Sequence, residues 1–234
     1  MAAAKRTKTS ISAFKDDQME KWILSGRMNT HMSKYSSDEI SEVEKTYKQP
    51  FYVMAFNLNA SPNVGMILRT SVLSGAEKFI IAGRKKYDNR TTVGAKERID
   101  IEYVDSFVTT SLTDMSATKD RRERVTHEYS LDAFVEYITV NNIYPVFVEQ
   151  ADDALNIYSD IDKIKDLYKT ILDEKKKMCF VFGNEGYGIP PEFLAHGTCV
   201  VIPQFGIMKC HNVAVSAGTV LPFFAHSCGF KMSP

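Results

Sequence analysis

A glycine-rich loop in the last quarter of the chain carries the residue types that most clearly suggest a binding site. The segment FGNEGYGIP, residues 182–190, surrounds the amide of Asn184 and the carboxylate of Glu185 with three glycines. Glycine permits positive φ angles and lets a ligand approach the backbone closely. The spacing differs from the GxGxxG of a dinucleotide loop, and the lysine of a phosphate-binding loop is missing. The loop is a candidate ligand site, although in isolation it also fits a plain tight turn.

A second candidate follows at residues 212–218, NVAVSAG, where nearly every side chain is small. Small residues at the start of a helix let a flat ligand or another backbone come close. A tightly packed core helix would show the same composition, and both interpretations can hold together. Pro222 lies further along the same stretch and should kink or end the helix, because proline lacks the backbone N–H.

Two buried strands are expected to position the loops that carry these residues. The runs MCFVF at 178–182 and CVVI at 199–202 are short, apolar and bounded by turn residues. Such runs are typical of strands buried on both faces of a parallel sheet. The loops at 183–190 and 203–211 follow them directly, and open α/β sheets bind ligands outside the carboxyl ends of their strands. We therefore expect both loops to line one ligand site.

The remaining chain alternates between strand and helix patterns. Ser61 is a candidate N-cap with Pro62 at the first helical position, and Gly75 closes that helix. The alternation predicts an α/β fold, a mostly parallel sheet with helices on both faces. The expected strands are residues 51–56, 78–82, 99–104 and 144–149. The expected helices are residues 38–48, 61–75, 131–141 and 161–177. Residues 83–98 are expected to form a basic loop, and residues 105–130 show no clear period.

The composition is that of an ordinary globular chain. Of its 234 residues, 44% are hydrophobic and 25% are charged, and the net charge is zero. No apolar run reaches the roughly 18–20 residues of a membrane helix, and the first residues lack the apolar core of a secretory signal. The four cysteines show no CxxC spacing, which indicates reduced thiols in a cytosolic or nuclear compartment, without disulfides or a metal site.

The charge distribution and polarity suggest how the chain is divided. Residues 1–50 are polar and are expected to form an N-terminal extension, whereas residues 51–234 are expected to form the main domain. The stretches 1–35 and 69–98 are rich in Lys and Arg. On a neutral protein they indicate either an RNA-facing surface or scattered solvated charge.

Three segments taken together resemble the ordered motifs of one enzyme family. NVGMILRT at 63–70, FGNEGYGIP at 182–190 and IPQFGIMKCHNVAVSAG at 202–218 are similar to motifs 1, 2 and 3 of the SpoU/TrmH branch of the SPOUT RNA methyltransferases. The resemblance covers about residues 51–226. It implies an α/β fold with a C-terminal trefoil knot, a homodimer, and methyl transfer from S-adenosylmethionine to a ribose 2′-hydroxyl of structured RNA, either tRNA or rRNA.

The resemblance also implies roles for four side chains. Arg69 matches the motif 1 arginine that activates the hydroxyl, and Asn63 matches the asparagine that orients this arginine or the RNA. Glu185 and Asn212 match the motif 2 glutamate and motif 3 asparagine near the reacting centre. Because arginine is ordinarily protonated, we expect Arg69 to position and polarise the RNA, acting across the dimer. A salt bridge for Arg69, and purely loop-stabilising roles for Glu185 and Asn212, remain the alternatives.

Cofactor contacts implied by the resemblance come largely from the backbone. One departure is that the serine and leucine common before the motif 3 asparagine are here Cys210 and His211. A thiol is a weaker hydrogen-bond partner than a hydroxyl, so a serine-dependent contact to the substrate is in doubt. The expected cofactor-binding residues are Phe182, Gly183, Gly186, Ile202, His211 and Asn212, with Pro203 shaping the loop.

The expected contacts to RNA lie in the basic segments of the chain. Fifty residues are too few for a separate RNA-binding domain, so RNA capture must rest on the extension, the basic loop and the dimer surface. Phosphate contacts carry no sequence information, so the choice between tRNA and rRNA stays open. The candidate RNA-binding residues are Arg84, Lys85, Lys86, Arg90 and Lys96.

A different class of function remains as the alternative. A catalytically inactive RNA-binding or ribosome-assembly protein on the same fold would retain much of this sequence, and Cys210 leaves that interpretation open. In either case we expect RNA as the partner, with no DNA and no membrane. The expected location is cytoplasmic, with a nuclear or organellar one left open.

Overall fold

The computed structural model describes residues 37–84, 87–112 and 125–231. The chain divides into two compact units. The smaller contains helix α2 (Ser37–Tyr47), which confirms the short helix expected near residue 38. The larger comprises Gln49–Phe230. The assignment of residues 1–50 to an extension stays a prediction, because much of that stretch lies outside the described residues.

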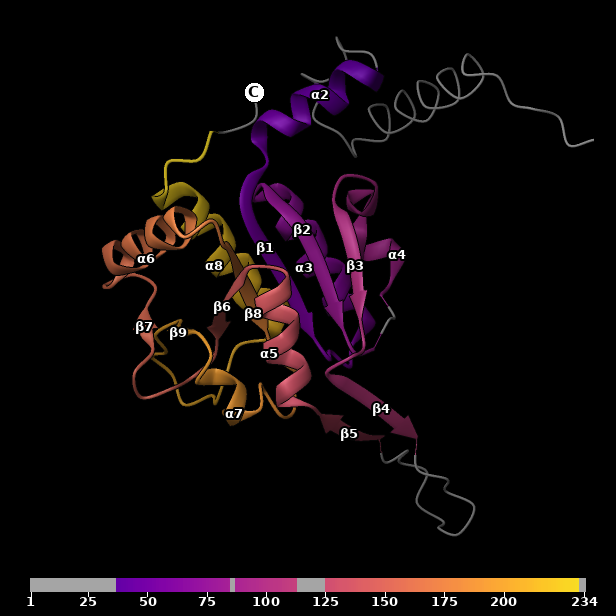
Figure 1. Cartoon of the computed structure of the whole chain (residues 1–234), viewed down its shortest axis with the longest axis vertical. Coiled ribbons are helices and arrows are strands. Elements are labelled where there is room, and N and C mark those ends of the chain that lie inside the picture. Colours follow the sequence, from indigo (N-terminus) through magenta and orange to yellow (C-terminus); the bar gives the residue numbers. More distant parts are fainter. Residues whose placement is uncertain (1–36, 85–86, 113–124, 232–234) are drawn as a thin grey trace, which may run out of the picture. The chain divides into compact units, whose positions relative to one another are not determined.

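A seven-stranded sheet forms the centre of the larger unit (Figure 1). Its strand order is β3-β2-β1-β8-β6-β9-β7, and every neighbouring pair is parallel. The predicted α/β fold with a mostly parallel sheet is confirmed, whereas the trefoil knot stays a prediction. The strands are β1 (Gln49–Phe56), β2 (Ala76–Ala82), β3 (Asp100–Val104), β6 (Ile143–Val148), β7 (Leu155–Asn156), β8 (Lys177–Phe182) and β9 (Thr198–Val201).

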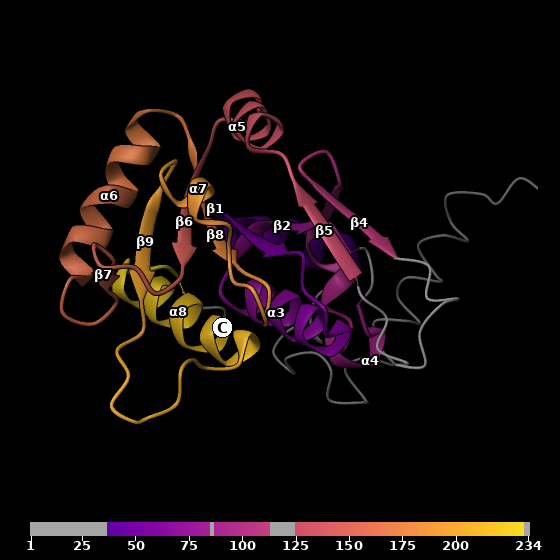
Figure 2. The same ribbon diagram turned by 90° about the horizontal axis from the view of Figure 1, so that it is seen from below.

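Helices cover both faces of this sheet. Figure 2 shows α3 and α8 side by side on one face, with α5 on the other. Helix α6 shares a hydrophobic cluster with α3 and α8, and α7 shares the opposite cluster with α5. The helices are α3 (Ser61–Leu73), α5 (Leu131–Val140), α6 (Ile161–Asp173), α7 (Pro191–Leu194) and α8 (Val213–Ser227).

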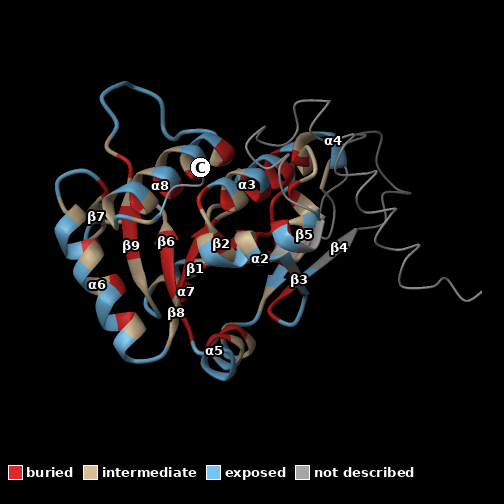
Figure 3. Cartoon of the chain, turned by 90° about the horizontal axis from the view of Figure 1, so that it is seen from above, coloured by how far each residue is buried: buried red, intermediate tan, exposed pale blue. Residues whose placement is uncertain are grey.

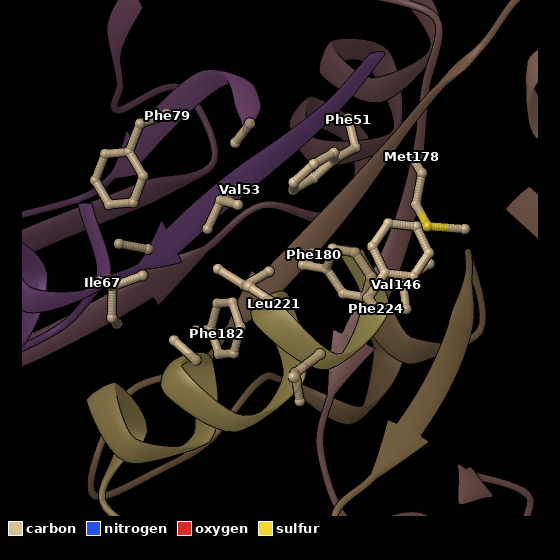
Figure 4. Close-up of a cluster of buried hydrophobic side chains, with 14 of the residues drawn as sticks. Phe51, Val53, Ile67, Phe79, Val146, Met178, Phe180, Phe182, Leu221 and Phe224 are labelled. Carbon is tan, nitrogen blue, oxygen red and sulfur yellow. The ribbon is translucent and has the colours of Figure 1, made fainter. Parts of the chain in front are cut away.

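The central strands are buried on both faces because their residues alternate between two cores. Along β1, Phe51 and Val53 belong to the cluster that contains α3 and α8, whereas Met54 and Phe56 belong to the cluster that contains α5. Figure 4 shows Phe51 and Val53 in the first cluster, and Figure 3 shows buried residues concentrated along the sheet. Burying each large side chain contributes about 1.5–3 kcal/mol, which explains why β1 is an uninterrupted apolar run.

Two segments that were expected to be irregular contain regular structure. Strands β4 (Val108–Leu112) and β5 (Val125–Tyr129) pair antiparallel in a second, two-stranded sheet within residues 105–130. The KDRRER run between them lies outside the described residues. The basic loop at 83–98 includes the short helices α4 (Asn89–Thr92) and η2 (Ala95–Glu97). The sequence showed no clear period at 105–130 and did not predict these two strands, because five-residue strands separated by a long polar connection leave little local pattern.

Three helix boundaries also differ from the expectation. The N-cap of α3 is Ala60, and Ser61 is the first helical residue without a capping side chain. Helix α6 ends at Asp173 instead of 177. Helix α8 continues through Pro222, which is exposed. Proline leaves the carbonyl of Gly218 without its helical donor, and because Gly218 is also exposed, solvent can bond that carbonyl instead.

Gly65 in α3 is expected to be essential for packing within the chain. A Cβ at Gly65 would overlap Oγ1 of Thr91 and lie 2.8 Å from the carbonyl oxygen of Asp88. We expect Gly65→Ala to lower the free energy of unfolding by about 1–3 kcal/mol through overpacking, measured by urea denaturation. Gly218→Ala in α8 is the matched control, since nothing lies within 4 Å of its added Cβ. Equal effects of the two substitutions would contradict this assignment.

Candidate functional site

A pocket of about 570 Å³ lies at the carboxyl ends of β6, β8 and β9. The strands contribute their last residues, Val148, Phe182 and Val201. Both loops singled out in the sequence line it. The lining residues are Val148–Gln150, Phe182–Ile189, Pro191, Leu194, Val200–Ile202, Gln204, Lys209–Val213 and Ser216. Its size lies within the range of about 300–1,000 Å³ that is usual for small-molecule sites.

A chain of hydrogen bonds joins the three motif segments beside this pocket. The side-chain amide of Asn63 donates from Nδ2 to Oε1 of Glu185 at 2.9 Å. The Oδ1 atom of Asn63 accepts from Nδ2 of Asn212 at 3.3 Å. Asn63 is buried, and its two amide atoms therefore have fixed partners. The structure brings these three predicted residues together from three distant parts of the sequence.

Glu185 is held by the turn that begins α3. Its Oε2 accepts from the backbone N–H of Asn59 at 2.8 Å, and Oε1 accepts from the N–H of Ala60 at 3.1 Å. Partial burial raises the pKa of Glu185, but the hydrogen bonds from Asn59, Asn63 and Ala60 outweigh it and hold the pKa below its usual value. A carboxylate with a lowered pKa is a weak base at neutral pH. This favours a positioning role for Glu185 over proton abstraction.

Asn212 connects the network to helix α8. As the N-cap residue it accepts with Oδ1 from the backbone N–H of Ala214 at 2.9 Å and of Val215 at 3.4 Å. This is the usual way in which asparagine satisfies the free donors at a helix start. The same side chain donates to Asn63, so the start of α8 and the start of α3 are fixed relative to each other.

Asn184 shapes the glycine-rich loop from within. It is buried, donates from Nδ2 to the carbonyl of Asn57 at 2.6 Å, and accepts with Oδ1 from the N–H of Gly186 at 2.8 Å. A Cβ on Gly183 would lie only 2.7 Å from Cγ1 of Ile189. The loop is therefore an ordered wall of the pocket, and glycine at 183 allows its two halves to approach each other.

Arg69 lies apart from the other three predicted catalytic residues. It is on the exposed face of α3 and does not line the pocket. In an ideal helix, a residue six positions after Asn63 lies about 9 Å further along the axis and on another face. Within the described part of the chain, the side chain of Arg69 forms no hydrogen bond or ion pair, so the salt-bridge alternative has no partner there.

The predicted cofactor-binding residues separate into two groups. Phe182, Gly183, Gly186, Ile202, His211 and Asn212 all line the pocket. Pro203 is not among the lining residues. Cys210, which stands where the related motif has serine, is an exposed thiol on the pocket wall.

The predicted RNA-binding cations have different environments. Arg84 donates from Nη1 to Oδ1 of Asn59 at 3.2 Å, which places it beside the turn held by Glu185. Arg90 is exposed but pairs with Asp88 at 2.7 Å, and Lys96 lies 3.7 Å from Glu97. Lys85 and Lys86 lie outside the described residues. Arg84 is thus the described cation of this set nearest the hydrogen-bond network.

Sequence reasoning missed the polar residues that follow β6. Glu149 and Gln150 line the pocket, and Nε2 of Gln150 donates to the carbonyl of Lys209 at 2.8 Å. Glu149 was predicted only as the end of a strand. The same rule that identified the two loops, that ligands bind at the carboxyl ends of parallel strands, could have identified it.

The fold and the pocket define the class of protein. A parallel α/β sheet whose ligand pocket is walled by a glycine loop and an asparagine-capped helix is a ligand-binding α/β enzyme scaffold. Residues 108–222 match the SpoU rRNA Methylase family. The matched segment is just under half of the chain, and this segment and the fold resemble those of SpoU-type RNA methyltransferases. No curated protein sequence matches the chain.

Solved structures share this fold at low sequence identity. The tRNA-modifying enzyme TrmH/SpoU of A. aeolicus is 18% identical with a TM-score of 0.56, over 81% of this chain and 83% of that one. An AdoMet-bound rRNA methyltransferase of Sinorhizobium meliloti is 21% identical (TM-score 0.52, 79% of this chain and 59% of that one). An RNA 2′-O ribose methyltransferase is 19% identical (TM-score 0.53, 77% and 58%). The chain thus spans about three fifths of the latter two proteins.

Proposed function

We propose that this protein transfers a methyl group from S-adenosylmethionine to a ribose 2′-hydroxyl of structured RNA, either tRNA or rRNA. The observation that carries the proposal is the hydrogen-bonded chain from Glu185 through Asn63 to Asn212. It assembles the three motif segments at one pocket. Similar folds occur in a tRNA-modifying enzyme, an rRNA methyltransferase and an RNA 2′-O ribose methyltransferase, which supports the reaction class.

The pocket fits the proposed cofactor. Its apolar wall, which includes Phe182 and Ile202, would suit a flat adenine ring, and Gly183 and Gly186 line the same pocket without side chains that would block a ligand. S-adenosylmethionine, when bound, supplies an electrophilic methyl group on a sulfonium. The residues that would hold it are Phe182, Gly183, Gly186, Ile202, His211 and Asn212, while Pro203 would shape the loop from outside the lining.

The roles of the proposed catalytic residues follow from their positions. Arg69 would position the RNA phosphate and polarise the ribose hydroxyl, since its guanidinium is exposed and stays protonated. The hydrogen-bonded chain of Asn63, Glu185 and Asn212 would hold the loops after β8 and β9 and the starts of α3 and α8 in place around the reacting groups. Glu185 remains ionised, so it would also offset positive charge at the start of α3.

We also propose a homodimer in which Arg69 of one copy reaches the pocket of the other. Met66 and Leu73, three and four positions from Arg69 on α3, are 39% and 77% exposed, and Val215 on the neighbouring helix α8 is 55% exposed. Neighbouring exposed apolar side chains of this kind are typical of an interaction surface. Arg69 lies on this same exposed face and away from the pocket of its own chain, so a second copy would supply it.

RNA contact is proposed at Arg84, Lys85, Lys86, Arg90 and Lys96. Of these, Arg84 is held beside the turn at Asn59 that donates to Glu185, where a backbone phosphate next to the target ribose could be bound.

Among the helices of the described residues, none has the length and apolar character needed to span a membrane. We propose a cytoplasmic location, with nucleus and organelles as the other sites of RNA modification.

Methyl transfer from labelled S-adenosylmethionine tests the proposed reaction. We expect label in either total tRNA or total rRNA, and the modified nucleoside released by nuclease digestion should be a 2′-O-methylnucleoside by mass spectrometry. An excess of S-adenosylhomocysteine should abolish the incorporation, which serves as the control. A methylated base would contradict the ribose assignment. Binding of cofactor without label in any RNA or assembled ribosomal particle would favour the RNA-binding or assembly protein instead.

A further inference from the structure

Glu149 presents a fixed carboxylate to the pocket that the motif comparison did not assign. Its Oε1 accepts from the backbone N–H of Gln150 at 3.0 Å, and its Oε2 accepts from the N–H of Ile189 at 3.3 Å. A Cβ at Gly188 would lie 2.6 Å from Oε2. The glycine therefore allows the loop backbone to lie directly against the carboxylate, which bridges the end of β6 and the glycine-rich loop.

The acceptor capacity of Glu149 distinguishes it from the other carboxylate that lines the pocket. A carboxylate has about four lone-pair sites on its two oxygens. Glu185 uses its oxygens for three donors, from Asn59, Ala60 and Asn63. Glu149 uses one site on each oxygen. Two adjacent oxygens that each retain acceptor capacity match two adjacent hydroxyl donors, the arrangement of a cis-diol.

The position of Glu149 indicates which part of a ligand it faces. It directly follows Val148 and accepts from the N–H of Ile189, and Val148, Ile189 and Leu194 are apolar residues that line the same pocket. If a flat ring of a ligand packs on these apolar residues, the sugar attached to that ring lies next to Glu149. In S-adenosylmethionine the ribose is attached to the adenine, whereas the α-ammonium group lies beyond the sulfonium. The ribose is therefore the part of the cofactor that fits beside Glu149.

We propose that Glu149 determines cofactor specificity by accepting hydrogen bonds from the 2′- and 3′-hydroxyls of the ribose of S-adenosylmethionine. This inference rests on the proposed function. It adds a side-chain contact to a cofactor site otherwise expected to use backbone groups. Hydrogen bonds to a charged acceptor are among the stronger ones in proteins, so removing them should change affinity measurably.

Calorimetry with S-adenosylhomocysteine and its 2′-deoxy and 3′-deoxy analogues tests the proposal without turnover. We expect the wild-type protein to bind each deoxy analogue about 10-fold or more weakly. In Glu149→Gln and Glu149→Ala this discrimination should shrink to within about 3-fold, because the paired charged acceptors are gone. Glu192→Gln, the same change at an exposed carboxylate outside the pocket lining, should keep the wild-type discrimination. Melting temperatures of the ligand-free variants should confirm that each one is folded.

Three outcomes would overturn this assignment in distinguishable ways. Unchanged discrimination in both Glu149 variants would show that Glu149 does not contact the diol. If these variants bind S-adenosylhomocysteine more weakly but bind 5′-methylthioadenosine normally, the carboxylate contacts the amino-acid part, since methylthioadenosine keeps the ribose and lacks the ammonium. Failure of the wild-type protein to bind S-adenosylhomocysteine at all would overturn the proposed function itself, and the inference with it.

Discussion

Replacing Arg69 by alanine is expected to lower methyl transfer to RNA by about 10²–10³-fold in kcat, the usual cost of removing one polarising donor from an active site. The melting temperature should change little, because Arg69 is exposed and forms no bond within the described part of the chain. Lys169→Ala, which removes an exposed cation from α6, is the control and should retain full activity. A stable Arg69→Ala protein with normal activity would refute the role of this arginine.

A heterodimer experiment tests whether Arg69 acts across the dimer. Arg69→Ala and Glu185→Ala chains with different affinity tags would be co-expressed, and the mixed dimer would be purified through both tags. If each pocket uses the partner's arginine, one of the two sites in the mixed dimer is intact, so activity should return to about half of the wild-type value. If Arg69 serves its own pocket, both sites carry a lesion, and the mixed dimer should be no more active than a dimer of the Glu185→Ala chain alone. A monomeric wild-type protein would contradict the dimer proposal directly.

Replacing Glu185 by glutamine is expected to have the second-largest effect, because it breaks the connection among the three motifs. Both carboxylate oxygens of Glu185 accept from donors, so the NH₂ group of a glutamine must face at least one backbone N–H. We expect the free energy of unfolding at pH 7 to fall by about 1–2 kcal/mol, and methyl transfer to fall by about 10-fold or more as the pocket wall loses its position. Urea denaturation and the labelled-RNA assay measure the two effects.

The pH dependence of this effect has a defined sign. The folded-state pKa of Glu185 lies below its unfolded value of about 4.3. The ionised carboxylate therefore contributes stability that is fully present above the unfolded pKa and is lost as the pH falls through the folded pKa. The stability difference between wild type and Glu185→Gln should be constant from about pH 6 to 7 and should shrink below about pH 4. A difference that is independent of pH would show that the carboxylate charge is not what stabilises the turn.

The local pattern of the sequence predicted the elements whose burial is uniform along their length. Strands β1 and β8 are continuous apolar runs because both of their faces are covered, and this is visible in any short window of sequence. The helix that begins after Asn212 was likewise indicated by its own stretch of small residues. The resemblance in three motifs then led to the family, although the matched segment begins at residue 108 and does not include motif 1.

Contacts between residues distant in the chain were decided only by the tertiary structure. Asn63 and Glu185 are 122 positions apart, and no periodicity relates them. The small size of Gly65 is required against Thr91 and Asp88 of the same chain, and no local pattern indicates this contact.

The sequence alone therefore determined the parallel α/β class, most of its elements and the loops that line the pocket, because alternating strand and helix patterns are local consequences of burial. The tertiary structure decided which polar groups meet. The Glu185–Asn63–Asn212 chain and the carboxylate of Glu149 exist as a site only because β6, β8 and α3 bring their ends together. A hydrogen bond requires its donor and acceptor atoms to lie within about 3 Å of each other, and the order of residues in the sequence does not give that distance.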